Sequence, residues 1–102
     1  MDTPTGVATS APRLPEEFHL QQNYPNPFNP TTTIGYQLPG VSHVALKVYD
    51  VLGREVATLV DGSQTAGSHV VAFSADKLPS GVYFYSIVAD ALHQVRKMIL
   101  VK

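Results

Sequence analysis

Apolar and polar residues alternate along most of this chain with a period of two, the pattern of strands that bury one face. The alternation is clearest at Ile34, Tyr36 and Leu38. Residues 41–49 could be drawn on a helical wheel, but their β-branched content favours a strand. We therefore predict seven strands, whose apolar members are Phe18 and Leu20; Ile34, Tyr36 and Leu38; Val44, Leu46 and Val48; Val56 and Leu59; Val71 and Phe73; Tyr83, Tyr85 and Ile87; and the run 95–101.

Turn signals separate these strands at short intervals. Asp50-Val51-Leu52-Gly53 has Asp first and Gly fourth, as in a type I turn, and should join residues 43–49 to 54–60. Leu78-Pro79-Ser80-Gly81 repeats this logic with Pro at the second position. Asp61-Gly62 and Ala66-Gly67 should bracket a longer loop, and residues 89–92 should turn the last hairpin. This spacing predicts an all-β fold, a seven-stranded antiparallel β-sandwich of the immunoglobulin or fibronectin type.

The stretch 23–30 is rich in proline and asparagine and predicts a structure other than a regular strand. Each proline fixes φ, has no N–H and pushes its predecessor toward an extended conformation. The stretch can therefore be neither a helix nor a central strand, and we expect a rigid loop with Asx turns. Its two aromatic residues, Tyr24 and Phe28, should be its packing anchors.

Composition bounds the domain organisation. Residues 1–13 are mostly Thr, Ala, Pro, Gly and Ser, so we interpret them as an interdomain linker ahead of a domain at 14–102. The net charge of −1 argues against a nucleic-acid partner, and no stretch is apolar enough to span a membrane. The first residues lack the apolar core of a signal peptide. The chain is then either cytoplasmic or a piece of a longer exported protein, and the linker favours the piece.

Catalytic chemistry has little support in this sequence. The four histidines are scattered, one to a predicted strand or strand start, and should lie at the surface: His19, His43, His69 and His93. Glu16 and Glu17 would point to opposite faces of an extended chain, which does not suit the paired carboxylates of a glycosidase. There is no cysteine, no phosphate-binding glycine loop and no calcium loop. We expect no cofactor, no metal and no enzymatic activity.

A carbohydrate-binding module remains an alternative, because small β-sandwiches often bind sugars on exposed aromatic side chains. The chain has no Trp but five Tyr. Tyr83 and Tyr85 share a face with Ile87 and are better explained as core residues. Tyr49, next to the Asp50 turn, is the better exposed candidate.

Four separated motifs carry a resemblance. They are 20–34 (LQQNYPNPFNPTTTI), 48–56 (VYDVLGREV), 78–85 (LPSGVYFY) and 96–102 (RKMILVK). In this order they resemble the C-terminal sorting domain of the Bacteroidetes type IX (Por) secretion system, type A. The likeness covers residues 14–102. Parts of two motifs also occur in immunoglobulin-like domains of flagellar hook caps, which are a further alternative.

The resemblance implies a function and a route. Such domains are secretion and cell-surface attachment signals at the end of larger exported proteins. It implies export through the periplasm to the cell surface or beyond, recognition by the outer-membrane translocon, removal by a surface sorting protease, and attachment of the passenger to anionic lipopolysaccharide. The residues that match the signal motifs are Asp50, Gly53, Arg54, Gly81, Tyr83, Lys97 and Lys102.

The run 95–101 is apolar on both faces beyond Lys97 and is closed by Lys102. A terminal strand of this kind suggests contact with a partner, either along its edge or across its apolar face.

Overall fold

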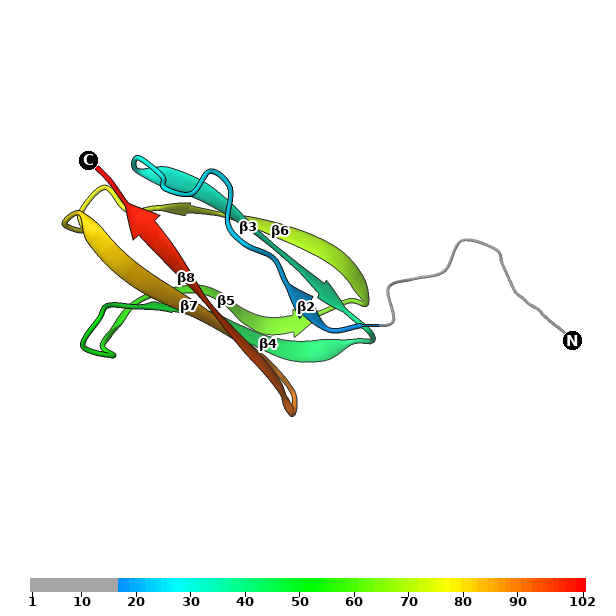
Figure 1. Ribbon diagram of the computed structural model, residues 1–102. Coiled ribbons are helices and arrows are strands. Elements are labelled where there is room, and N and C mark those ends of the chain that lie inside the picture. Colours follow the sequence, from blue (N-terminus) through cyan, green and yellow to red (C-terminus); the bar gives the residue numbers. More distant parts are fainter. Residues whose placement is uncertain (1–16) are drawn as a thin grey trace, which may run out of the picture.

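The computed structural model describes residues 17–102 and contains strands as its regular elements (Figure 1). The predicted linker at 1–13 and the predicted domain start at residue 14 lie outside the described residues. The strands are β2 (His19–Leu20), β3 (Thr31–Leu38), β4 (Ser42–Tyr49), β5 (Glu55–Gln64), β6 (Gly67–Ser74), β7 (Gly81–Ala89) and β8 (Leu92–Leu100). All seven predicted strand regions are confirmed.

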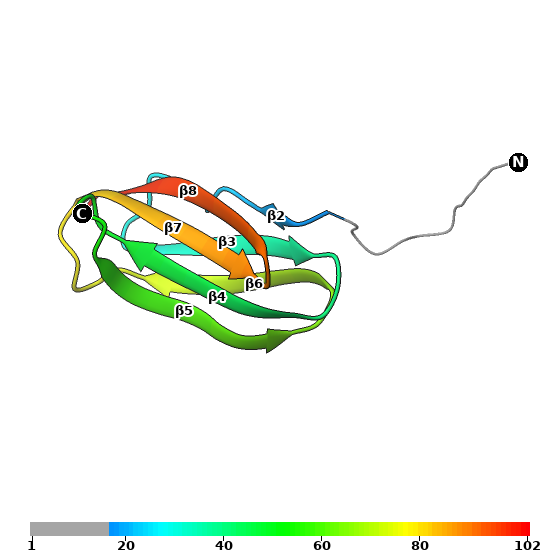
Figure 2. The ribbon, with the colours of Figure 1, turned by 90° about the horizontal axis from the view of Figure 1, so that it is seen from below.

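The strands form two antiparallel sheets that face each other, as Figures 1 and 2 show. One sheet has the order β2-β3-β6 and the other has the order β5-β4-β7-β8. In an antibody constant domain four strands form the first sheet and three the second. Here β5 pairs with β4 of the second sheet and not with a strand of the first sheet, so the second sheet has four strands and the first has three. The predicted all-β sandwich is confirmed.

The inward residues of both sheets fill one core. Alternate positions of β3, β4 and β7 are buried, as the period of two predicts. Tyr36 and Tyr85 are the largest fully buried side chains, and Phe28 joins them from the loop before β3. Every buried side-chain N or O atom in residues 17–102 has a hydrogen-bond partner. In the same residues, we find no helix with the length and apolar character needed to cross a bilayer.

The weak periodicity of β5 has a structural cause. Its register against β4 shifts twice, between Leu46 and Lys47 and between Val48 and Tyr49. Each shift inserts an extra residue into β5, and such β-bulges break a strict alternation of buried and exposed residues. The irregular run of Val56 and Leu59 is therefore a bulged edge strand.

The predicted turns have mixed outcomes. The turn at 50–53 and the hairpin at 89–92 are confirmed, with the N–H of Gly53 donating to the carbonyl of Asp50 at 3.0 Å. The expected loop between Asp61-Gly62 and Ala66-Gly67 is wrong, because β5 continues to Gln64 and only two residues separate it from β6. In the loop before β7 the hydrogen-bonded turn is Ala75–Leu78, three residues earlier than predicted.

Residues 18–28, which we call the strap, run from the first sheet to the outer edge of β8. The hydroxyl of Tyr85 donates to the carbonyl of Gln21 at 2.7 Å and accepts the N–H of Asn23 at 2.8 Å. Burial raises the pKa of Tyr85, so this hydroxyl keeps the proton that it donates. Asn23 is itself buried and its side-chain amide donates to Thr32 and Pro25. A buried tyrosine thus fixes the course of the strap.

The strap covers the edge of β8. The side-chain carbonyl of Asn26 accepts the N–H of Ile99, and the main chain of Phe28 bonds to both Ile99 and Val101 at 2.9 Å. Phe28 is 1% exposed and is the anchor that the sequence predicted. Tyr24 is 81% exposed, so its predicted role as an anchor is wrong. The strap also takes the edge that we expected a partner to pair with.

Replacing Tyr85 with Phe tests whether the Tyr85 hydroxyl holds the strap in place. The change keeps the ring but leaves the Gln21 carbonyl and the Asn23 N–H without their partner. We expect a loss of about 1–3 kcal/mol in the free energy of unfolding, together with faster hydrogen exchange at the Asn23 amide. The matched control is Tyr49→Phe, because the Tyr49 hydroxyl has no hydrogen bond within residues 17–102. Equal losses for the two variants in chemical denaturation would contradict the role assigned to Tyr85.

Candidate functional site

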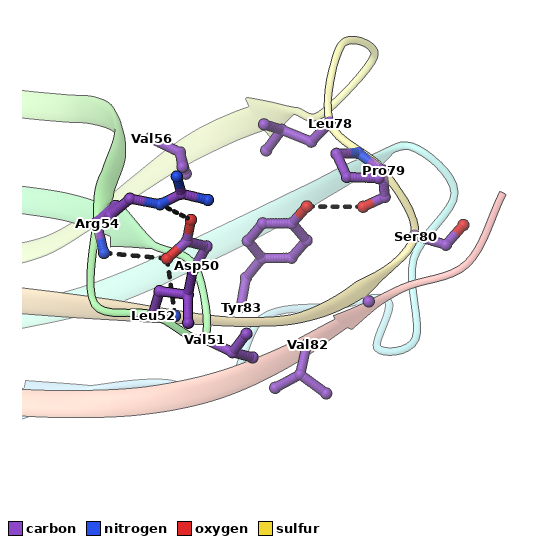
Figure 3. A pocket seen from close by; sticks show the side chains of 11 residues that line it. Asp50, Val51, Leu52, Arg54, Val56, Leu78, Pro79, Ser80, Val82 and Tyr83 are labelled. Carbon is purple, nitrogen blue, oxygen red and sulfur yellow. Dashed lines mark hydrogen bonds and ion pairs between the residues drawn. The ribbon is translucent and has the colours of Figure 1, made fainter.

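Two turns that lie far apart in the sequence enclose one pocket of about 350 Å³ (Figure 3). One wall is the β4–β5 turn with the start of β5, and the other is the loop 78–80 with the start of β7. Four of the seven predicted signal residues line this pocket, namely Asp50, Arg54, Gly81 and Tyr83. The second and third motifs of the sequence therefore meet at a single surface.

Asp50 organises its own turn. Its carboxylate accepts the N–H groups of Leu52 and Arg54 at 2.9 and 3.0 Å and the guanidinium Nε of Arg54 at 2.8 Å. These bonds, led by the main-chain N–H of Arg54, hold the pKa of Asp50 below its usual range. Because the pKa of Asp50 is lower in the folded chain than in the unfolded chain, its ionised carboxylate stabilises the fold at pH values above the unfolded-state pKa. This stabilisation is lost as the pH falls through the folded-state pKa. The turn is therefore complete at neutral pH.

Gly53 has a geometric role in the same turn. Its φ is +83°, which an L residue with a side chain rarely adopts. A type I turn followed by a residue in this conformation is the usual three-residue hairpin loop. Gly53 does not line the pocket but gives the turn its shape.

Tyr83 forms the floor of the pocket, between the two turns (Figure 3). It is 5% exposed, and its hydroxyl donates to the carbonyl of Pro79 at 2.7 Å. Burial, and secondarily the charge of Asp50, raises the pKa of Tyr83. A tyrosine at the start of a strand that bonds back to the preceding loop is the tyrosine corner of β-sandwiches. Tyr83 therefore has a structural function that is sufficient to explain the third motif.

The rim of the pocket has a different character from the floor. Val51 and Leu52 are 65% and 73% exposed although they are apolar. The Arg54 side chain is 72% exposed, whereas that of Asp50 is only 15% exposed. The accessible surface thus combines apolar side chains with a guanidinium group, which suits a contact with another protein.

The two remaining signal residues, Lys102 and Lys97, lie at different distances from the pocket lining: the first contacts it and the second does not. Lys102 is tied to the loop beside the pocket, because its N–H donates to the Ser80 hydroxyl at 3.0 Å and its ammonium to the Asp76 carbonyl. Lys97 does not line the pocket. It is exposed on β8, and its carbonyl accepts the side chain of Gln22 at 2.8 Å.

Other chemistry has little geometric basis. None of the four histidines is fully buried, as predicted. Within the described residues, no three His, Asp or Glu side chains converge to hold a metal ion. Tyr83 and Tyr85 are buried, as expected of core residues, and Tyr49 is half-buried. A flat aromatic platform for a sugar is therefore not formed by these three residues.

Comparison with known proteins identifies the family. The model of the secretion system C-terminal sorting domain matches residues 22–102. The chain belongs to this family, as the motifs predicted. No curated protein matches the chain.

Membership of the family defines the function. The domain is a signal for type IX secretion and is not catalytic. It is recognised by the Por secretion system, and the protein that carries it is secreted or displayed at the cell surface. The match favours this function over the sugar-binding and hook-cap alternatives.

Sequence reasoning missed part of the pocket. Val51, Leu52, Leu78 and Pro79 line it but were considered only as turn residues. A usable signal was present, since two adjacent apolar residues at the centre of a β-turn are expected to be exposed. The meeting of the two turns has no signal in a single sequence, because it depends on how β4 and β7 pair.

Replacing Gly53 tests the turn. Nothing lies within 4 Å of a Cβ built at this position, so the cost of Gly53→Ala is conformational. We expect a loss of about 1–2 kcal/mol in the free energy of unfolding, and a smaller loss for Gly53→Asn, because Asn tolerates positive φ. Thermal melts of the two variants make the comparison. An Asn variant as unstable as the Ala variant would show that backbone conformation is not the constraint.

Proposed function

We propose that the outer-membrane translocon of the type IX system recognises the folded domain at the pocket between the two turns. The observation that carries this proposal is the convergence of the Asp50–Arg54 turn and the Leu78–Tyr83 loop, which are separated by more than twenty residues. Tyr83 and Gly53 shape this surface, and Arg54 and Leu52 are its accessible groups. Lys102, tied to the loop at Ser80, belongs to the same surface.

The proposed route follows from the same function. Residues 1–13 serve as an interdomain linker, and residues 14–102 form the sorting domain. The passenger crosses the periplasm, is exported at the outer membrane and is cut by the surface sorting protease between residues 10 and 17. It is then joined to anionic lipopolysaccharide. The strap supports a cut ahead of residue 18, because from Leu20 onward the main chain is hydrogen-bonded to the rest of the domain.

Lys97 has a separate role in the proposal. It lies on the outer face of the four-stranded sheet, away from the lining of the pocket. We assign it to a second contact with the secretion machinery across the exposed face of β8, where Val95 is 50% exposed. Edge pairing is replaced here by contact with the face, because the strap occupies the edge.

A secretion assay tests the proposal. A fluorescent reporter with a Sec signal is fused ahead of residues 1–102 and expressed in a host with this secretion system. We expect surface display in the host and periplasmic retention when the translocon is deleted. Equal display in both strains would refute recognition by the translocon.

Arg54→Ala in that reporter should reduce display strongly while the purified domain melts almost as the unmodified chain does. The guanidinium is exposed, so its removal changes the surface more than the packing. The matched control is Lys47→Ala on the same hairpin, since Lys47 pairs with Glu55 and lies outside the pocket. Display that falls equally for both variants would point to general surface charge instead of this pocket.

Lys102→Ala and Tyr83→Ala separate recognition from folding. Lys102→Ala keeps the main-chain bond to Ser80, so we expect lost display with a stability change within about 0.5 kcal/mol. Tyr83→Ala removes a buried ring and should cost about 3–5 kcal/mol, so display fails because the domain unfolds. Deleting residues 101–102 is a poorer test, because it also removes the bond from Val101 to Phe28. A Lys102→Ala variant that melts as early as Tyr83→Ala would make Lys102 a structural residue.

A further inference from the structure

Three of the four edges of the two sheets are protected within residues 17–102. The strap covers the edge of β8 through Asn26 and Phe28. At the edge of β2, the side chains of Gln94 and Arg96 bond to the main chain of Leu20. The edge strand β5 is bulged twice against β4 and carries two carboxylates. Coverage, bulges and charges are the usual means of preventing a further strand from pairing.

The fourth edge, that of β6, has none of these features. Residues 67–74 contain no Asp, Glu, Lys, Arg or Pro, and they pair with β3 without a register shift. The N–H of Ala75 donates to the carbonyl of Pro30, so every second residue back from Ala75 directs its main-chain groups toward β3. The intervening residues direct theirs outward, and they are Ser68, Val70, Ala72 and Ser74. The edge therefore presents a regular set of donors and acceptors.

The outward residues of β6 are self-complementary. Read in either direction about Val71, they give a hydroxyl side chain, two apolar side chains and a hydroxyl side chain. An antiparallel second copy centred on Val71 places Ser68 opposite the partner's Ser74 and Val70 opposite the partner's Ala72, and each such pair exchanges two main-chain hydrogen bonds. A register shifted by two residues would place one serine beyond the partner's β6 and the other against an apolar residue. The matched register therefore uses the whole edge.

Val70 has an apolar surface that such a copy would cover. Its side chain is 73% exposed, and on β3 it lies opposite Gly35, which has no side chain to pack against it. In the matched register the partner's Ala72 lies beside it on the free side, and cross-strand neighbours of this kind stabilise a sheet. On the inner face, Val71, which packs on the core, meets the partner's Val71. The second copy thus supplies the neighbour that β3 does not.

Like charges do not meet in this register. Residues 65–75 contain no Asp, Glu, Lys or Arg, and the first charged side chains after β6 are Asp76 and Lys77. In an antiparallel pair centred on Val71 they lie beside the partner's residues 65–66, at the opposite end from the partner's own Asp76 and Lys77. The usual electrostatic penalty for bringing two identical strands together is therefore missing.

We propose that two copies of the chain pair through β6, antiparallel and centred on Val71, to form one continuous six-stranded sheet. Its outer strands are the two copies of β2, whose edges are protected, so the assembly closes as a two-fold dimer and does not extend into a filament. Because one strand edge supplies the main contact, the association is reversible. The inference goes beyond the proposed function and does not depend on it, since no residue of β6 lines the pocket between the two turns.

Sedimentation of the 102-residue chain over a range of concentrations tests the pairing. We expect an average mass that rises from that of one chain toward that of two and no further. Val70→Lys introduces a charge on the edge close to its symmetry mate, and it should raise the dissociation constant of the dimer at least about tenfold. The matched control is Val41→Lys, because Val41 is 71% exposed but precedes β4 and lies outside β6. It should sediment like the unmodified chain.

A single introduced cysteine tests the register, since the chain has none of its own. In the matched register Val71 lies opposite the partner's Val71 as a non-hydrogen-bonded pair, with a Cα separation of about 4.5 Å that a disulfide can span. Val71→Cys should therefore give a disulfide-linked dimer on mild oxidation, at least about tenfold faster than Val41→Cys does. Thermal melts of the reduced variants establish that each is folded.

Four results would overturn the proposal. They are a chain that stays monomeric at all concentrations, a mass that grows beyond two chains, equal dissociation constants for the two lysine variants, and equal crosslinking of the two cysteine variants. A dimer that Val70→Lys leaves intact belongs to another surface. If Val71→Cys does not fold, the exposed positions decide instead, because Val70→Cys should then crosslink to Ala72→Cys faster than to itself. The secretion assay is unaffected by these outcomes, so the two proposals can fail separately.

Discussion

The Tyr85 hydroxyl is a single group that donates to one strap carbonyl and accepts from one strap N–H. It lies in a side chain with no exposed surface, so leaving either partner unpaired would cost far more than at the surface. From this point the strap continues to the edge of β8, where Asn26 and Phe28 bond to the main chain. The coverage of this edge of the sandwich therefore begins at the Tyr85 hydroxyl.

The signal motifs combine structural and recognition roles in a definite way. Asp50 and Tyr83 direct their polar atoms into the domain, where these complete a turn and a corner. Arg54 and Leu52 are held by that framework but remain exposed. A surface of this type is stiff because its buried members are fully bonded, and stiffness reduces the entropy lost on binding. The motifs thus define a shape as well as a set of contact groups.

The sequence was sufficient for the strands, because a period of two follows directly from the pleat. It was also sufficient for the Asp50 turn, where local side-chain bonds fix the geometry. It failed at Tyr24, because proline-rich loops fix backbone direction and not which aromatic ring faces inward. It failed at Asp61-Gly62, where pairing with β4 overrides the local turn preference. The pocket could not be predicted, since it depends on contacts between residues distant in sequence.

The strap has a consequence for the order of events during folding. Residues 20 and 26 are bonded to residues 94, 96 and 99, which follow them by 73 to 76 positions. Contacts between such distant positions close a long loop, which costs chain entropy, and they require both segments to be present. The first part of the domain therefore stays unlatched until its final strand has arrived. The strap can be held in place only in a chain that extends through β8. Secretion machinery that recognises the folded surface would therefore not export passengers whose chains end before this strand.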